Sequence, residues 1–271
     1  MAFEVRNFVI DRVRRGIMLH SETGALMWAL NQIENPSLNV TAETTDAVDA
    51  LGVPIATFNR AKQAEFSAES SLFDLGLLAA QNATELDVAT TENSYDVPYF
   101  DEIKVTEAGK LNLVYSPVAG TLKHVYLLNG DGSTGAQYSL GDTATGNSFT
   151  LADKTVTLNA AAATVGSRWL AVYDRKAYSD EGNGAVRVTG NAVDFPHAGR
   201  FLMEVLGVDV CNPSVLYSAI IEFPNAKLLS DFELGFTTDA KHPFTLRAMQ
   251  DYCDPDKRLF RIYIPETATA I

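Results

Sequence analysis

The chain has 271 residues, and 46% of them are hydrophobic, which is enough for a sizeable core and excludes a globally disordered protein. Its formal net charge of −13 repels phosphate groups, so binding of nucleic acid or of an anionic membrane through charge is excluded as its main role. Two cysteines, Cys211 and Cys253, are too few for a disulfide scaffold. They indicate assembly in a reducing cytosol, and the sequence leaves open whether they pair.

The N-terminal region has no basic stretch followed by an apolar one, so we expect no signal peptide. No apolar run approaches the roughly 20 residues of a membrane-spanning helix. A small basic cluster, Arg12, Arg14 and Arg15, stands out in an otherwise acidic protein. Two interpretations stay open for this cluster: a solvated face, or a contact patch for an acidic surface on a neighbouring subunit.

Residues 38–67 predict a long β-hairpin. Residues 38–49 are rich in β-branched side chains, which favours a strand, and residues 55–66 form a matching return strand. The turn between them contains Leu51, Gly52, Val53 and Pro54. Each strand would exceed the usual length of about five or six residues.

This hairpin lacks the apolar face that an ordinary core needs. One side of its first strand carries no large apolar residue, and it consists of Asn39, Thr41, Glu43, Thr45, Ala47 and Asp49. A long hairpin is marginal in water by itself, and its unpaired edges invite pairing with another chain. We therefore expect neighbouring subunits to complete its sheet. The alternative is an ordinary water-exposed hairpin on a monomer.

One substantial helix is expected, over residues 70–82. Ser71 with Asp74 resembles a capping box, and Leu72, Leu75 and Ala79 lie on one helical face. We expect this apolar stripe to cover the sheet and to bind no ligand.

The rest of the chain predicts short strands separated by turns. Strands are expected near 122–128, 148–158 and 168–174, with the turn Asn129-Gly130-Asp131-Gly132 after the first of them, which is typical of a β-sandwich. Later segments alternate between apolar and polar residues, as antiparallel strands do. These segments are Val215–Phe223, Phe232–Phe236, Phe244–Ala248 and Phe260–Ile264.

The sequence shows no motif of catalysis. The histidines have neither H-x-x-x-H spacing nor a cysteine partner at zinc-ligand spacing. A nucleophile elbow, a Walker loop and a dinucleotide-binding fingerprint are also missing. We therefore expect no catalytic residue, no metal and no cofactor, and hence no enzyme.

The order of these elements resembles the major tail tube proteins of bacteriophages. The resemblance covers residues 12–100, with the long hairpin and the helix, and residues 185–265, with the closing strands. The phrases that carry it are Ser70–Gln81, Tyr217–Pro224, Leu228–Phe236, His242–Ala248 and Leu259–Ile264.

The resemblance implies a mainly β fold, a tail-tube-type β-sandwich or barrel with one flanking helix and a long hairpin. Residues 1–100 and 181–271 would form this discontinuous domain. Residues 101–180 lie outside the resemblance, and two interpretations stay open for their short strands: an inserted immunoglobulin-like or β-sandwich module, or a further part of the same barrel. The resemblance further implies hexameric rings that stack into the tail tube of a virion, assembled in the host bacterial cytoplasm, through which DNA passes without specific binding. The partners would be other copies, the initiator or baseplate, the terminator and a sheath in tails that have one, with no membrane.

Closing such hairpins into a barrel would remove their edges and create a water-filled lumen. From alternation, the lumen-facing residues would be Thr41, Glu43, Thr45, Asp49, Gln63 and Glu65. A slip of one residue would reverse this facing. Carboxylates in the lumen would repel phosphates, whereas a basic lumen would hold DNA by counterion release.

Two further functions fit the sequence. One is an adhesive or carbohydrate-binding β-sandwich of a virion, such as a decoration or fibre protein, which predicts exposed aromatic platforms and a stable monomer. The other is the tube protein of a bacterial contractile injection system, which shares the ring architecture without the DNA.

Overall fold

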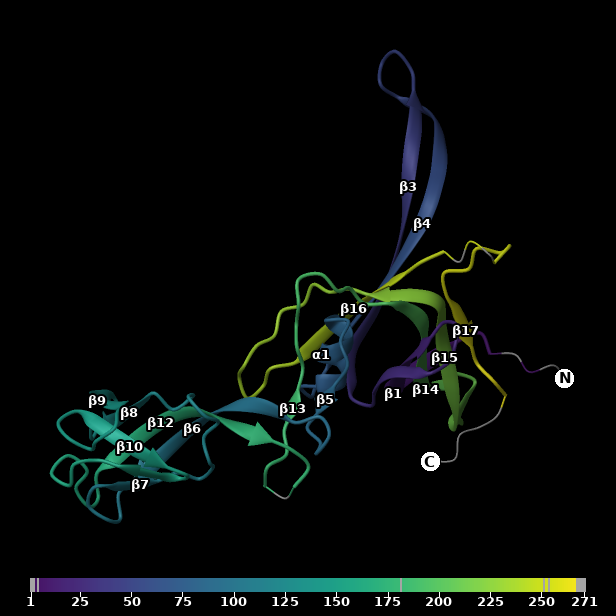
Figure 1. Ribbon diagram of the computed structural model, residues 1–271. Helices are drawn as coiled ribbons and strands as arrows, with labels where there is room; N and C mark the ends of the chain where they lie inside the picture. Colours follow the sequence, from purple (N-terminus) through teal and green to yellow (C-terminus); the bar gives the residue numbers. More distant parts are fainter. Residues whose placement is uncertain (1–2, 4, 181, 251, 253, 267–271) are drawn as a thin grey trace. The chain divides into compact units, whose positions relative to one another are not determined.

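A computed structural model of the chain describes residues 3, 5–180, 182–250, 252 and 254–266. The fold is mainly β, as predicted, with one α-helix in this described part (Figure 1). The chain divides into two compact units, Met1–Leu86 with Val188–Ile271, and Asp87–Arg187. The expected insert, 101–180, lies inside the second unit, and its origin as an insertion stays a prediction.

The first unit is built on one eight-stranded antiparallel sheet. In chain order its strands are β1 (Phe8–His20), β2 (Leu26–Leu30), β3 (Ile33–Val48), β4 (Pro54–Ser70), β14 (Ala198–Asp209), β15 (Asn212–Leu228), β16 (His242–Ala248) and β17 (Arg261–Tyr263). Across the sheet the order is β2-β1-β14-β15-β16-β4-β3, and β17 pairs with β15. The sheet curls into a nearly closed barrel. A Cβ atom on Gly16 of β1 would lie 2.7 Å from Cδ1 of Ile33 at the start of β3, so these two strands meet without hydrogen bonding.

An aromatic cluster fills the interior of this barrel. The ring of Phe66, on β4, lies 5.6 Å from that of Phe201, 5.8 Å from that of Phe223 and 6.1 Å from that of Phe244. These side chains are fully buried, and burial of large apolar side chains is the main force that holds such a barrel together. Because Phe66 belongs to β4, the same cluster anchors the base of the long hairpin.

The helix is shorter than expected. α1 spans Leu75–Gln81, and its N-cap is Asp74, whose Oδ1 accepts a hydrogen bond from the backbone N–H of Leu77 at 2.8 Å. The prediction of a helix start near Ser71 was therefore wrong. The backbone N–H of Ser71 donates to the oxygen of Gln32 instead, which ties this residue to the chain before β3. Leu77 and Ala79 are buried, as a helix that covers a sheet requires.

The second unit contains a seven-stranded sheet in the order β6-β12-β8-β9-β10-β11-β7. Its strands are β6 (Tyr95–Lys104), β7 (Lys110–Asn112), β8 (His124–Leu128), β9 (Thr134–Leu140), β10 (Ser148–Ala152), β11 (Thr155–Thr157) and β12 (Arg168–Ala177). Two short strands, β5 (Asp87–Val88) and β13 (Val186–Arg187), pair where the chain enters and leaves this unit. Trp169, Tyr173 and Phe149 are buried in its core.

Two predicted strands differ from the observed ones. The strand expected over 148–158 is divided into β10 and β11 at Asp153, whose φ of 50° turns the chain. The alternating segment Phe232–Phe236 is not a strand, because its backbone has no strand partner in the described structure. Its aromatic rings pack locally instead: Phe232 lies 6.2 Å from His242, and Phe236 lies 6.5 Å from Phe73.

Candidate assembly surface

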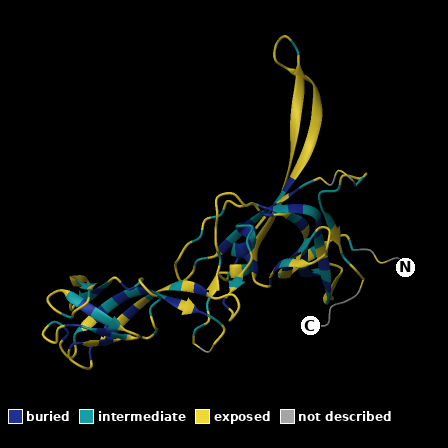
Figure 2. Ribbon diagram, in the orientation of Figure 1, coloured by how far each residue is buried: buried dark blue, intermediate teal, exposed yellow. Residues whose placement is uncertain are grey.

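The hairpin formed by β3 and β4 projects from the first unit into solvent (Figure 1), and it is exposed along almost its whole length (Figure 2). From residue 39 to residue 63 every side chain is exposed except the half-buried Asp49. Large apolar side chains share this exposure: Leu51 is 89% exposed, Ile55 72% and Phe58 59%. The burial of apolar surface that stabilises most sheets is therefore missing from the projecting ribbon.

Both edges of the projecting ribbon lack a strand partner in the described part of the chain. β3 ends the order of strands in the sheet, with β4 as its one hydrogen-bonded neighbour. β4 pairs with β16 from Glu65 to Ser70, so its segment 54–64 has a second free edge. Rows of unpaired N–H and C=O groups on both edges form a template for strands of other chains.

The register places most of the expected lumen residues on one face of this ribbon. Thr41 lies opposite Gln63, and Asn39 lies opposite Glu65, so these four side chains share a face. Glu43 and Thr45 continue that face along β3, because alternate residues of a strand point the same way. The other face runs into the buried core.

A β-bulge changes the facing of β4 above Lys62. The register moves from Ala42 opposite Lys62 to Thr44 opposite Asn59, so β4 holds one extra residue there. As a result, Phe58 lies opposite Thr45. The Nε of Arg60 donates a hydrogen bond to Oγ1 of Thr45 at 3.3 Å, which places this guanidinium on the same face as Thr45.

Asp49 organises the turn and does not lie on the face of β3. Its Oδ1 accepts hydrogen bonds from the backbone N–H groups of Leu51, at 2.8 Å, and Val53, at 2.9 Å. Gly52 has a φ of 83°, a conformation that side chains with a Cβ rarely adopt. The tip residues Leu51, Gly52 and Val53 therefore form a tight turn, and Pro54 is the first residue of β4.

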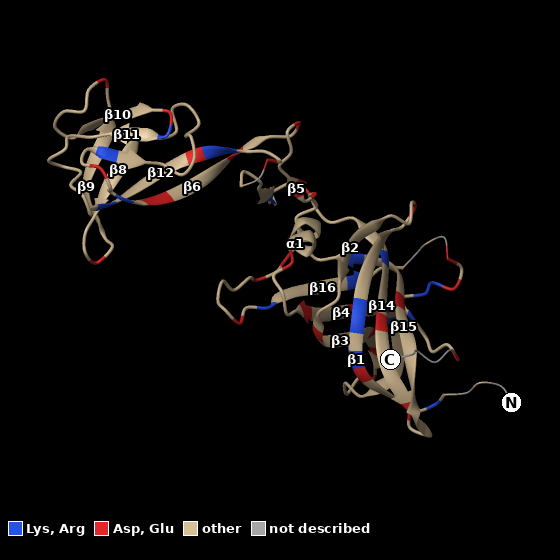
Figure 3. Ribbon diagram, turned by 90° about the horizontal axis from the view of Figure 1, so that it is seen from below, with Lys and Arg blue, Asp and Glu red and all other residues tan. Residues whose placement is uncertain are grey.

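The basic cluster of β1 has partners within its own chain. Arg14 and Arg15 form ion pairs with Glu204 of β14, at 3.1 and 2.7 Å, and Arg12 pairs with Asp11 at 3.2 Å. Figure 3 shows the basic segment of β1 beside an acidic segment of β14. Burial alone would raise the pKa of Glu204, but a hydrogen bond from Ser218 and the two guanidinium groups outweigh it and lower this pKa.

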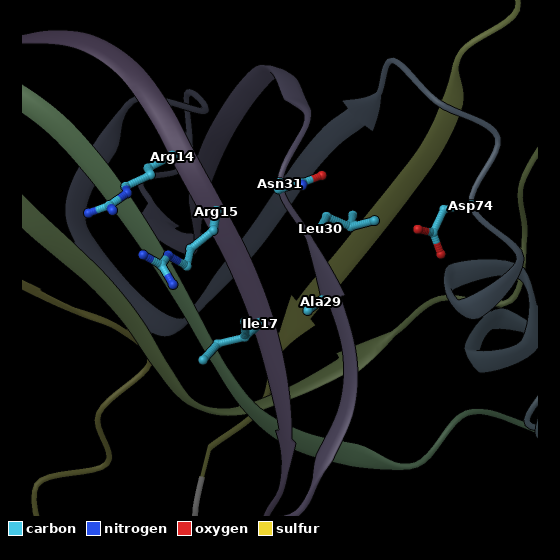
Figure 4. Close-up of a pocket in the computed structure, with 7 residues that line it drawn as sticks. All are labelled: Arg14, Arg15, Ile17, Ala29, Leu30, Asn31 and Asp74. Atoms are coloured by element: carbon cyan, nitrogen blue, oxygen red, sulfur yellow. The ribbon is translucent and has the colours of Figure 1, made fainter.

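Next to this cluster lies an open hollow of about 620 Å³ (Figure 4). Its lining residues are Arg14, Arg15, Ile17, Ala29, Leu30, Asn31 and Asp74. The guanidinium groups turn toward Glu204 for their ion pairs, which leaves them about half exposed beside the hollow. A contact between this cluster and a neighbouring subunit stays a prediction.

Three features of the described residues bear on metals, membranes and disulfides. Among them, no group of three or more His, Cys, Asp or Glu side chains could hold a metal ion. No helix in the described part of the chain is both long and apolar enough to cross a membrane. Cys211 is an exposed free thiol, and the question of its pairing stays open because Cys253 lies outside the described residues.

A profile of the YomU/Tube protein family matches residues 8–259, a range that includes the hairpin, the helix and the strands β14 to β16. No curated protein matches the chain. The family match confirms the resemblance to phage tube proteins that the order of elements had indicated. The chain belongs to the YomU/Tube protein family.

Proposed function

We propose that this protein is the structural, non-enzymatic subunit of a phage tail tube, in which copies join into hexameric rings and the rings stack in the virion tail. One observation carries the proposal. The ribbon from residue 39 to residue 63 is exposed on both faces and unpaired along both edges in the described chain. The family assignment supports the same function.

The proposal rests on the marginal stability of an isolated ribbon. A two-stranded hairpin gains little from folding by itself, and this one also exposes apolar residues such as Ile55 and Phe58. Hairpins from neighbouring copies would supply the missing strand partners, and closing the resulting sheet into a barrel removes every free edge. A heterologous contact repeated around an axis closes into such a ring.

In such a barrel, the face of the ribbon opposite the core would line the lumen. This face carries Thr41, Glu43, Thr45, Gln63 and Glu65. We include in the proposal a water-filled, lightly acidic lumen through which DNA leaves the virion during ejection. Arg60 offsets part of the negative charge, so DNA would slide because few groups hold it, with weak repulsion from the carboxylates.

The proposed tube needs partners at its ends and on its outer surface. These would be the initiator or baseplate, the terminator and a sheath in tails that have one, all joined during assembly in the host cytoplasm. DNA would pass without being held, because the hairpin offers no basic groove for the phosphate backbone.

Negative-stain electron microscopy of the purified protein tests this function. We expect rings or tubes from the natural sequence, directly or after addition of a tail initiator. In the matched variant, Asn-Gly replaces residues 41–63 between the directly paired Val40 and Ala64, since this dipeptide forms a two-residue hairpin turn. This variant retains the barrel core, so we expect it to fold and to stay monomeric.

Two results would overturn the proposal. One is a natural protein that remains monomeric at high concentration with an initiator present, which would favour an adhesive protein. The other is a shortened variant that forms the same rings as the natural protein.

A further inference from the structure

Charge is divided between the two strands of the hairpin. β3 carries Glu34, Glu43 and Asp46 and no lysine or arginine. The free segment of β4, residues 54–64, carries Arg60 and Lys62 and no acidic residue. The two free edges of the ribbon therefore have opposite charge, in a protein whose net charge is −13.

The four charges of the projecting ribbon lie within one stretch of it. The pairs Thr41 opposite Gln63 and Asp46 opposite Thr57 enclose them. None of the ion pairs among the described residues involves Glu43, Asp46, Arg60 or Lys62. Within the chain, Asp46 accepts a hydrogen bond from the Thr57 hydroxyl at 2.6 Å, and Arg60 donates one to Thr45. A single protomer thus leaves these charges without an opposite charge as partner.

The charges are also divided equally between the two faces of the ribbon. Glu43 and Arg60 share the face of Thr41 and Thr45. Asp46 lies on the other face opposite Thr57, and Lys62 lies on that same face opposite Ala42. Each face therefore holds one acidic residue on β3 and one basic residue on β4.

We propose that the acidic edge of β3 in one protomer pairs with the basic edge of β4 in the next copy. Glu43 would then meet Arg60 of the neighbour on one face, and Asp46 and Lys62 would give the two joined edges opposite charge on the other face. This inference rests on the proposed ring, and it adds which edges join and what makes them join in one order.

The symmetry of a ring supports this pairing. Copies related by rotation about one axis point their hairpins the same way, so β3 of one copy runs antiparallel to β4 of the next. Glu43 and Arg60 of adjacent copies stay at nearly the same level, and long side chains reach both directly opposite and diagonal cross-strand neighbours. Lys62 lies opposite Ala42, whereas Asp46 lies opposite Thr57, so these two charges attract at longer range and mainly at low salt. Contacts between like edges would set acid against acid or base against base, which disfavours a two-fold dimer of hairpins.

Charge-reversal variants of the full chain test the inference. The acid-reversed variant carries Glu43→Lys with Asp46→Lys, and the base-reversed variant carries Arg60→Glu with Lys62→Glu. Each variant alone would bring like charges together at every interface. We expect each to raise the concentration at which rings appear roughly tenfold or more at low salt.

The two variants mixed in equal amounts are the decisive sample. A ring in which they alternate has opposite charges at every contact, so the mixture is expected to form rings near the concentration that the natural protein needs. Light scattering and negative-stain microscopy measure this recovery. Because salt screens exposed charges, the deficit of each separate variant should shrink at high ionic strength.

A variant with Glu22→Lys and Glu92→Lys changes the net charge as the acid-reversed variant does, but at residues that are not part of the hairpin, and it should assemble normally. Assembly of either reversed variant alone as readily as the natural protein would overturn the inference. So would a mixture of the two folded variants that fails to recover. Both results leave ring formation by the natural protein intact, whereas a natural protein that forms no rings overturns the proposed function itself.

Discussion

Nε2 of the buried His242 donates a hydrogen bond to Oε1 of Gln81, with 2.7 Å between the two atoms. The amide nitrogen of Gln81 donates to the backbone oxygen of Pro243 at 2.9 Å, which fixes the amide orientation and assigns the imidazole proton to Nε2. Nδ1 of His242 is buried without a hydrogen-bond partner in the described structure. A second proton on this ring would therefore be a poorly solvated charge.

This arrangement predicts a loss of stability in acid. Burial lowers the pKa of His242, and the nearby carboxylate of Asp74 opposes this only in part. Below the ordinary histidine pKa of about 6.5, the unfolded chain binds a proton that the folded chain does not, so stability falls as pH falls. We expect His242→Gln to flatten the fall in melting temperature between about pH 7.5 and about pH 5.5. Thermal unfolding followed by circular dichroism measures this, and equal slopes in the two proteins would contradict it.

The aromatic cluster predicts a large effect of Phe66→Ala. The side chain is 2% exposed and contacts three other phenylalanines, so its removal leaves a cavity in the core and loosens the base of the hairpin. We expect a loss of about 3–5 kcal/mol in the free energy of unfolding. Phe236→Ala removes a ring that is 88% exposed and should change this free energy by less than about 0.5 kcal/mol. Urea denaturation compares the two, and similar costs would refute the assignment of Phe66 to the core.

Gly207 predicts that a single methyl group disturbs the pairing of β1 with β14. A Cβ atom there would clash with the backbone oxygen of Val9 and lie 2.6 Å from the ring of Phe8. We expect Gly207→Ala to lower the free energy of unfolding by about 1–3 kcal/mol, because the backbone oxygen of Val9 cannot move without breaking the sheet. Gly235→Ala is a matched control, since its closest contact would be an ordinary 3.4 Å to Cβ of Ala240. Equal melting temperatures of the two variants would show that β1 and β14 lie further apart in the protein than the structure has them.

The turn of the hairpin predicts a local effect of Asp49→Ala. This change removes the acceptor of the Leu51 and Val53 amides and leaves the core untouched. We expect these amides to exchange with solvent roughly tenfold faster, because each hydrogen bond contributes about 1 kcal/mol. Asp49→Asn keeps an oxygen acceptor and should largely preserve their protection. Hydrogen exchange measured on the monomer tests this expectation, and unchanged rates in Asp49→Ala would show that the turn does not depend on the Asp49 side chain.

The hairpin could be predicted from the sequence because two long runs of strand-forming residues flank a turn with glycine and proline. The direction of the side chains in the half of the hairpin near the turn could not be predicted, because a prediction from alternation assumes that every second residue points to the same face. The extra residue near Arg60 has no compositional signal, and it moves Phe58 to the face that strict alternation gives to Asn59.

The role of Asp49 in the turn could have been predicted from the sequence, although the alternating pattern of the strand favoured a different prediction. An aspartate at the start of a turn commonly binds the backbone N–H groups that follow it, so its assignment to the strand face was avoidable. For the segment Phe232–Phe236, by contrast, the pattern in the sequence led to a wrong prediction. Its alternation is real, but a strand also needs a partner for its backbone, and the sequence does not show where that partner is. The charge division between β3 and β4 is visible in the sequence, but it gains meaning only when the edges are known.

The pairing of β5 with β13 has a further consequence. Asp87 lies opposite Arg187 and Val88 opposite Val186, and an ion pair of 2.5 Å joins Asp87 to Arg187. The polypeptide thus enters and leaves the second unit through adjacent, directly paired positions. Whatever lies between them can lengthen, shorten or be exchanged without stretching the rest of the molecule. The segment between β5 and β13 could therefore be replaced, in evolution or by design, for example with a tag or an affinity module, while the remaining chain keeps its own geometry.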